Sequence, residues 1–392
     1  MLAAQGLLRD APFGRGLSGA RRALEHLGSV QIDTISVVER AHHHVLHTRV
    51  PGYRGAHLNT LVSRGEAFEY WSHAAAYLPM RDFRFALPRM HAWRSGPKHW
   101  SHGSRSEIAT VARSVLDRVR ADGPVRARDF EDPRQTRGGW WDWKPAKLVL
   151  ELMFHSGELI VTGRDGFEKV YDLPERALPD GLDLTMPDHA ELASHLLDNA
   201  LRAHVFALPA EVTYLRKDAA LRRALAACID ARIAAGELVR VRVGDESRIR
   251  VAPVAALDTR LPSLRPRVRW LSPFDPAVIH RDRTRDLLGL DYQIECYVPA
   301  PKRRFGYFCL PMLWADALVG RLDARAARRE RVLHLESVHV ESPIDARDAF
   351  ATAFAAEART FATFNGCDEV RIRRTVPGTW LRPLRTALDC PE

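Results

Sequence analysis

The chain has 392 residues, of which 46% are hydrophobic and 27% are charged. That length is sufficient for two to four packed domains and excludes a small disulfide- or metal-stabilised module. The formal net charge is +9, a basic balance that favours polyanionic partners without identifying one. Most of the positive charge is arginine, which suits bidentate phosphate contact but is also typical of GC-rich genomes.

The cysteines are five in number, scattered, and without a Cys-x-x-Cys pair. This pattern argues against a disulfide framework, a zinc ribbon and an iron–sulfur cluster. No apolar run reaches membrane-spanning length, and the N-terminus lacks the apolar core of a signal peptide. Phosphate-loop, dinucleotide-binding and serine-hydrolase motifs are missing from the sequence. We therefore expect a cytoplasmic protein with no metal, no cofactor and no membrane segment.

Residues 30–33, Val-Gln-Ile-Asp, alternate apolar and polar side chains. In an extended segment alternate side chains share a face, so the apolar pair would anchor the segment to a core. Gln31 and Asp33 would then project together on the other side, where they can hold a water molecule or face a developing positive charge. They are the candidate catalytic residues. The alternative is that Asp33 is the N-cap or a turn residue of a helix that opens near Ile35.

Four histidines follow closely, and two of them, His43 and His47, stand four residues apart on one helical face. A metal site would be possible there, but no Glu-containing His-Glu-x-x-His frame is present. We interpret these histidines as core or surface residues.

A helix followed by a Gly-Glu step and an extended segment occurs three times, at Gly65, Gly157 and Gly236. Glycine there supplies a left-handed helix end, and a strand starts at once. In the second copy, helices over residues 106–120 and 144–155 precede a strand–turn–strand over residues 159–171. The third copy repeats that order. Three helices and a β-hairpin make a winged helix, a helix-turn-helix variant that binds DNA or, alternatively, other proteins.

We therefore predict an α+β fold in which three tandem winged-helix domains precede a C-terminal β-rich domain. A proline- and arginine-rich linker near residue 262 separates the last domain from the others. That domain should contain strands at residues 290–297, 304–310, 318–323 and 331–340 and a helix over residues 344–364. The predicted domains are 1–103 with the Gln-x-Asp motif, 104–180, 181–260, and the C-terminal 261–392.

Aromatic and basic residues supply the candidate DNA contacts. Trp71 and His73 end the first repeat, either as part of a packed strand or facing DNA. The tryptophan-rich stretch at residues 138–147 fits stacking on exposed bases by Trp141 beside Lys144 and Lys147, or packing between domains. The cluster at residues 301–307 indicates phosphate contact more than a solvated turn; its basic residues are Lys302, Arg303 and Arg304.

Several long blocks in this chain resemble the crosslink-repair DNA glycosylases of the YcaQ/AlkX type, which are relatives of the AlkZ glycosylases. The blocks are LGSVQIDTISVVERA (27–41), EYWSHAAAYLP (69–79), GGWWDWKPAK (138–147), LSPFDP (271–276) and DYQIECYVPAPKRRFGYFCLP (291–311). The resemblance covers essentially the whole chain. It implies the same fold of three winged helices and a C-terminal β-rich domain.

The resemblance also implies excision of N7-alkylated guanine, as monoadducts and as interstrand crosslinks. The family's Gln-x-Asp motif falls on Gln31 and Asp33, whereas the AlkZ branch has Gln-x-Gln. An N7-alkylated base is cationic and leaves readily, so Asp33 would stabilise the sugar cation and help deprotonate a water that Gln31 orients. The motif has no lysine, which favours a monofunctional enzyme. A crosslinked base stays tied to the opposite strand, so an open basic channel is expected.

The sequence departs from the family pattern in three places. Met1 falls inside the family's first helix, Ala74 stands where many relatives have Glu, and Ile279-His280 replaces a frequent Trp-Asp. The expected partner is double-stranded DNA carrying alkylated or crosslinked guanine, and we expect a monomer. Two alternatives stay open: a non-catalytic winged-helix regulator that is indifferent to Gln31 and Asp33, and a paralogue that excises another alkylated base.

Overall fold

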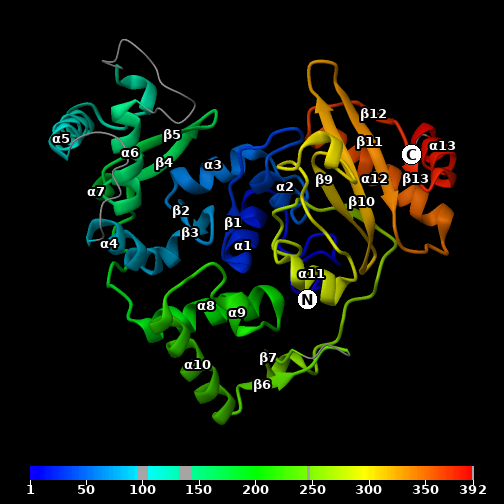
Figure 1. Ribbon diagram of the computed structural model, residues 1–392, viewed down its shortest axis with the longest axis horizontal. Helices are drawn as coiled ribbons and strands as arrows, with labels where there is room; N and C mark the ends of the chain where they lie inside the picture. Colours follow the sequence, from blue (N-terminus) through cyan, green and yellow to red (C-terminus); the bar gives the residue numbers. More distant parts are fainter. Residues whose placement is uncertain (96–104, 132–143, 245–247, 391–392) are drawn as a thin grey trace.

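A computed structural model describes residues 1–95, 105–131, 144–244 and 248–390 of the chain. It is a mixed helix and strand structure, as predicted for the α+β class. Within those ranges three small antiparallel sheets precede one larger mixed sheet. Figure 1 shows the first segment of the chain in the middle, with the second segment to its left, the third below it and the large sheet to its right.

The first segment consists of three helices and a three-stranded sheet of order β1-β3-β2, followed by a helical arm. Its elements are α1 (Gly16–Leu27), β1 (Val30–Gln31), α2 (Ala41–His47), α3 (Gly55–Ser63), β2 (Ala67–Trp71), β3 (Ala75–Pro79) and α4 (Leu87–Ser95). Residues 1–15 form turns, and the first described helix begins only at Gly16, so Met1 does not lie inside it. Leu2 and Leu7 are instead buried against residues of the C-terminal segment.

The second and third segments each place helices before a two-stranded antiparallel hairpin. The second contains α5 (Arg105–Asp122), α6 (Pro145–Ser156), β4 (Ile160–Asp165), β5 (Glu168–Asp172) and the short α7 (Pro174–Ala177). The third contains α8 (His189–His204), α9 (Pro209–Val212), α10 (Ala219–Ala234), β6 (Leu238–Val241) and β7 (Arg250–Pro253). These elements follow the predicted order; that they are winged helices with the predicted boundaries stays a prediction.

The Gly-Glu steps end three helices as expected. Gly65, Gly157 and Gly236 have φ angles of 66°, 71° and 73°, in the left-handed region that glycine adopts without strain. In each case a strand begins within three residues. The repeated step therefore turns the chain abruptly from helix to sheet at the same point of all three segments.

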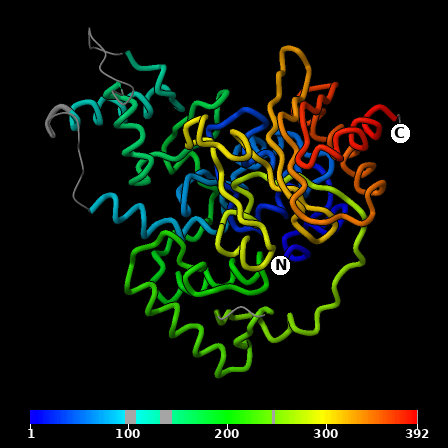
Figure 2. The backbone as a smooth tube through the Cα atoms, turned by 45° about the vertical axis from the view of Figure 1, so that its right-hand side comes forward, coloured from blue at the N-terminus to red at the C-terminus, as the bar shows by residue number. Residues whose placement is uncertain are grey.

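The C-terminal segment follows residues 257–267, which contain no helix or strand and which run along one side of the molecule in Figure 2. Its sheet has the order β12-β11-β10-β9-β8, with β13 also paired to β11. The elements are β8 (Val268–Trp270), α11 (Arg281–Leu288), β9 (Cys309–Trp314), β10 (Ala317–Ala327), β11 (Val332–Val340), α12 (Arg347–Phe364), β12 (Glu369–Ile372), β13 (Thr375–Val376) and α13 (Leu381–Asp389). Helix α12 packs its phenylalanines into the core of this sheet.

Two of the predicted C-terminal strands are wrong. Residues 290–297 contain no strand, and the strand predicted at 304–310 begins only at Cys309. The reason lies in side chains that take the backbone donors of this stretch. The Glu295 carboxylate accepts from the N–H groups of Arg304, Phe305 and Gly306 at 2.8–3.1 Å. The predicted strands at 318–323 and 331–340 and the helix at 344–364 are confirmed by β10, β11 and α12.

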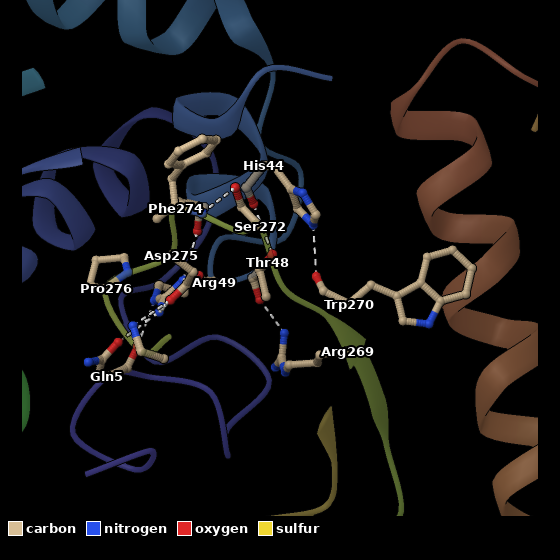
Figure 3. Close-up of polar contacts among 12 residues, drawn as sticks. Gln5, His44, Thr48, Arg49, Arg269, Trp270, Ser272, Phe274, Asp275 and Pro276 are labelled. Atoms are coloured by element: carbon tan, nitrogen blue, oxygen red, sulfur yellow. Dashed lines mark hydrogen bonds and ion pairs between the residues drawn. The ribbon is translucent and has the colours of Figure 1, made fainter. Parts of the chain in front are cut away.

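A buried ion pair joins the first segment to the C-terminal one (Figure 3). Arg49, just after α2, donates two hydrogen bonds of 2.6 and 2.8 Å to the carboxylate of Asp275, and both side chains have no exposed surface. The same guanidinium donates to the backbone and side-chain oxygens of Gln5 at 2.8 and 3.0 Å. The block 271–276 thus acts as a structural lock between the two segments.

Two further contacts lie beside this lock in Figure 3. His44 of α2 is hydrogen-bonded to the backbone oxygen of Trp270 at 2.8 Å, and the guanidinium of Arg269 donates to the backbone oxygen of Thr48. Helix α2 is therefore held along its length against the start of the large sheet. None of the described helices combines the length and apolar character that crossing a bilayer requires.

Replacing Asp275 by Ala should destabilise the fold by about 3–5 kcal/mol, because Arg49 would keep its charge in a buried site without its partner. The double variant Arg49→Met/Asp275→Leu, which removes both charges, should recover most of that loss. Urea unfolding measures both, and Asp282→Asn, at an exposed position of α11, is the control. A loss below about 1 kcal/mol for Asp275→Ala, the range of surface pairs, would contradict the assignment.

Candidate functional site

Gln31 and Asp33 lie on one polar side of a buried strand. Gln31 ends β1, which pairs with β3 so that Gln31 lies opposite Ala76, and the N–H of Ile32 continues the ladder to the oxygen of Ala75 at 2.8 Å. Val30 and Ile32 are 0% and 7% exposed, whereas Gln31 and Asp33 are half-buried. This alternation agrees with the prediction that the two apolar side chains face the core and the two polar side chains face the other side.

Asp33 lies two residues beyond the end of β1, where its side chain closes a turn, and it does not cap a helix. Its Oδ1 accepts a hydrogen bond of 2.7 Å from the N–H of Ile35. The next helix, α2, begins only at Ala41 with Arg40 as its N-cap residue. Asp33 is therefore a turn residue, but the helix expected near Ile35 is wrong. One carboxylate oxygen of Asp33 is occupied by the backbone, and this fixes the direction of the side chain.

Residues 34–40 continue as a loop because they dock on the C-terminal sheet. Val38 is buried in the core of that sheet, and the oxygen of Val37 accepts from the N–H of Ala326 at 2.7 Å. The N–H of Glu39 donates to Oδ1 of Asn365 at 2.6 Å. The loop that follows Asp33 is consequently anchored to the C-terminal segment, which lies far from it in the sequence.

Burial raises the pKa of Asp33; the hydrogen bond from Ile35 and the charge of Arg40 oppose that shift without cancelling it. Desolvation penalises the ionised form of a carboxylate, so an adjacent cation would stabilise it more than it would in water. The side chain is thus poised to interact with a positive charge that a substrate brings or develops.

His73 contacts Gln31 directly. Its Nε2 lies 3.0 Å from Oε1 of Gln31, at the turn between β2 and β3. Burial and the charge of Arg216 lower the pKa of His73, so the imidazole is neutral at neutral pH. A neutral His73 with its proton on Nε2 donates to Gln31, which leaves the carboxamide NH2 free to be directed elsewhere. His73 was predicted to contact DNA; the structure brings it into the Gln31 site even though Ala74 replaces the usual Glu.

The C-terminal segment supplies a second wall. The turn at residues 295–303 is fixed by Glu295 and by the hydrogen bond of 2.8 Å from Nε of Arg303 to the oxygen of Val298. It presents Tyr297, which is 77% exposed. Burial raises the pKa of the Tyr297 phenol, and electrostatic interactions with Cys296 and Asp33 raise it further, so the phenol group lies within electrostatic range of Asp33.

The other predicted DNA contacts are distributed over three segments. Lys302 and Arg304 are exposed beside the Tyr297 turn, whereas Arg303 is partly used to hold that turn together. Trp71 is half-buried against the ring of His155 at 5.6 Å. Their DNA contacts stay predictions.

The tryptophan-rich stretch belongs to the second segment and is only partly described. Trp141 lies outside the described residues. Lys144 precedes α6, where its Nζ lies 3.4 Å from the oxygen of Phe130, and Lys147 follows within the same helix. The described contacts do not join either lysine to Gln31 or Asp33, so their role in DNA binding stays a prediction.

The histidines of α2 serve the core. His42 and His44 are buried, His43 pairs with the hydroxyl of Tyr53 at 2.8 Å, and His47 stacks on Phe364 with 3.8 Å between ring centroids. Within the described ranges, no group of three or more His, Cys, Asp or Glu side chains is arranged to hold a metal ion. The interpretation of these histidines as packing residues agrees with their contacts.

The chain belongs to the AlkZ-like DNA glycosylases: the family model for "DNA glycosylase AlkZ-like" matches residues 24–364. Membership identifies it as a glycosylase of DNA repair, a hydrolase whose substrate is DNA, and confirms the resemblance found in the sequence. The structure of the DNA glycosylase AlkZ of Streptomyces sahachiroi is similar, with a TM-score of 0.59 and 17% identity over 95% of this chain and 96% of that chain. At that identity the similarity shows a shared fold.

The raised pKa of Asp33 has a consequence for stability. The native state binds this proton more tightly than the unfolded chain does, so the ionised carboxylate costs stability at pH values above the native pKa. Asp33→Asn, whose amide oxygen can still accept from Ile35, should therefore raise the free energy of unfolding at pH 7.5. The gain should shrink toward pH values of about 4, near the unfolded pKa. Urea unfolding at several pH values measures this, with exposed Asp258→Asn as control; a variant less stable than the wild type at pH 7.5 would contradict it.

Proposed function

We propose that this protein hydrolyses the N-glycosidic bond of N7-alkylated guanine in chromosomal DNA, in monoadducts and in interstrand crosslinks. The observation that carries the proposal is the half-buried Asp33 carboxylate, fixed in direction by Ile35 and placed beside the Gln31–His73 pair. An aspartate at this position of the Gln-x-Asp motif favours the crosslink-repair branch over the Gln-x-Gln branch.

The proposed reaction needs no strong acid. Alkylation at N7 makes the base cationic, so when the C1′–N9 bond breaks its electron pair neutralises the leaving base. Positive charge passes to the deoxyribose as an oxocarbenium ion, which the Asp33 carboxylate stabilises electrostatically. A water oxygen then bonds to C1′ and gives its proton to Asp33, leaving free alkylguanine and an abasic sugar.

Gln31 and His73 have different proposed roles: Gln31 contacts the water or the sugar, and His73 positions Gln31. With its carbonyl oxygen engaged by His73 at 3.0 Å, the carboxamide of Gln31 has its NH2 group free to donate to the attacking water or to the sugar. His73 acts here as a positioning residue for Gln31. We further propose a monofunctional enzyme, because the motif provides no lysine to form an imine with the sugar.

A crosslinked base cannot be withdrawn into a closed pocket, because it remains attached to the opposite strand. The exposure of Tyr297 beside Asp33 supports a site that stays open to such a substrate. The net charge of +9 and the exposed Lys302 and Arg304 support contact with the DNA backbone next to it. The proposed partner is therefore duplex DNA, bound by a monomer in the cytoplasm.

The direct test is to incubate the purified protein with a duplex that carries 7-methylguanine or a nitrogen-mustard crosslink, and to reveal abasic sites with alkali. The wild type and the control Asp258→Asn should incise, and Asp33→Asn should lose roughly 10²-fold or more in rate while still binding DNA. Full activity of Asp33→Asn would refute the assigned chemistry. If the wild type shows no incision above background, the protein is a DNA-binding module; a covalent adduct trapped by borohydride would refute the monofunctional mechanism.

Tyr297 should contribute through its aromatic face, because a cationic base is attracted to the π-electrons of a ring. Tyr297→Phe should keep near wild-type kcat/KM on 7-methylguanine DNA, and Tyr297→Leu should lose roughly three- to thirtyfold. Equal activity of the Phe and Leu variants would exclude a ring contact with the base, and loss in both would instead assign the role to the hydroxyl group.

A further inference from the structure

A loop of the third segment reaches the Gln31 site. The loop follows α9 and contains Tyr214, whose ring centroid lies 5.8 Å from that of His73 and 4.3 Å from that of His280. Two residues later, Arg216 lines a cavity of about 140 Å³ together with Trp71 and Ser72, the residues just before His73. The third segment thus adds a cation next to the turn that holds Gln31.

A second arginine approaches the same turn from α4. The guanidinium of Arg89 lies 5.4 Å from the ring of Trp71, and one of its terminal nitrogens donates to the oxygen of Ser72 at 3.5 Å. Its Nε is buried and has no hydrogen-bond partner among the described residues. Arg89 and Arg216, which come from different segments, therefore both approach the turn at residues 71–73.

The charges of these two arginines are not compensated within the described part of the chain. No ion pair there joins either guanidinium to a carboxylate, and Asp82, the acidic residue that lines the same cavity, lies 3.7 Å from Arg81 instead. Burial lowers the pKa of Arg216, and the charge of Arg89 lowers it further. Two like charges sheltered from water without an anion are costly unless a ligand supplies that anion.

We propose that Arg89 and Arg216 form a phosphate site that holds one backbone phosphodiester of the DNA strand beside the nucleotide facing Gln31. This inference rests on the proposed function insofar as DNA is the substrate. Guanidinium groups match the geometry of phosphate oxygens with paired N–H donors, and the rings of Trp71 and Tyr214 offer apolar surface to the adjoining sugar. The two arginines are positioning residues: they fix the strand so that C1′ meets Asp33.

The proposed site would give the third segment a role in DNA binding. Because Arg89 belongs to the first segment and Arg216 to the third, one phosphate bridges both. Binding DNA would relieve the repulsion between the two cations and would strengthen the contact between α8 and α1 that the hydrogen bond of 3.1 Å from Arg202 to the oxygen of His26 already makes.

The test measures binding to a duplex that contains a tetrahydrofuran abasic analogue, by fluorescence anisotropy over a range of salt concentrations. Arg89→Gln and Arg216→Gln should each weaken binding roughly tenfold, the scale of a hydrogen bond to a charged group, and should each reduce the slope of log K against log salt by about 0.9. Arg382→Gln, on exposed α13 at the far edge of the molecule in Figure 1, is the matched control and should change neither quantity.

Replacing single phosphates near the analogue by neutral methylphosphonates locates the contact. At one position the replacement should weaken wild-type binding roughly tenfold and should have no further effect on Arg216→Gln. Equal losses in both proteins at every position would overturn the proposal. Because this experiment needs no base excision, it tests the phosphate site independently of the glycosylase assay.

The thermal stability of the variants gives a second readout. Arg216→Gln, which removes one of two uncompensated cations, should leave the Tm unchanged or raise it. A Tm several degrees below that of the wild type for this variant would show that Arg216 has a structural partner, and would contradict the proposal.

Discussion

The buried ion pair between Arg49 and Asp275 is the contact on which the position of the site depends. It ties α2 to the start of the large sheet, with both side chains removed from solvent and with Gln5 and the backbone oxygen of Val45 accepting from the remaining donors of Arg49. The segment that bears Gln31 and Asp33 leads into α2, and the turn that presents Tyr297 follows Asp275 in the C-terminal segment. The ion pair therefore sets the separation between the two walls of the site.

The loop between Asp33 and α2 fixes the position of the Asp33 carboxylate relative to the C-terminal sheet. It is clamped by Val38 in the core of the sheet and by the backbone bond from Ala326 to Val37. Such a clamp can hold a half-buried carboxylate in place even though its ionised form costs stability, as in enzymes that hold destabilised groups in their sites. The uncompensated charges of Arg89 and Arg216 also cost stability, and the proposed phosphate ligand supplies the anion that would offset this cost.

The sequence predicted the local features well and the contacts between segments poorly. Alternation at residues 30–33 and the glycines at 65, 157 and 236 depend only on short-range geometry, and the structure agrees with them. The false strands near residue 295 arose because Glu295 takes the backbone donors of residues nine to eleven positions later, which no local pattern reveals. Arg216 and Tyr297 gave no local signal either, since their proximity to Gln31 and Asp33 exists only in the folded chain. The block 271–276 was recognisable as a family feature, but its role as a lock appears only through Arg49.

The central claim is that one sheltered carboxylate, Asp33, carries the chemistry in its ionised form. The most direct measurement is the pH dependence of the single-turnover rate constant for release of 7-methylguanine from duplex DNA. Because burial raises the pKa of Asp33, the rate should fall with decreasing pH around an apparent pKa above the usual value of about 4, and Asp33→Asn should lack this limb together with the activity. An enzymatic rate that stays constant down to pH values of about 4, or that keeps the same limb in Asp33→Asn, would contradict the account.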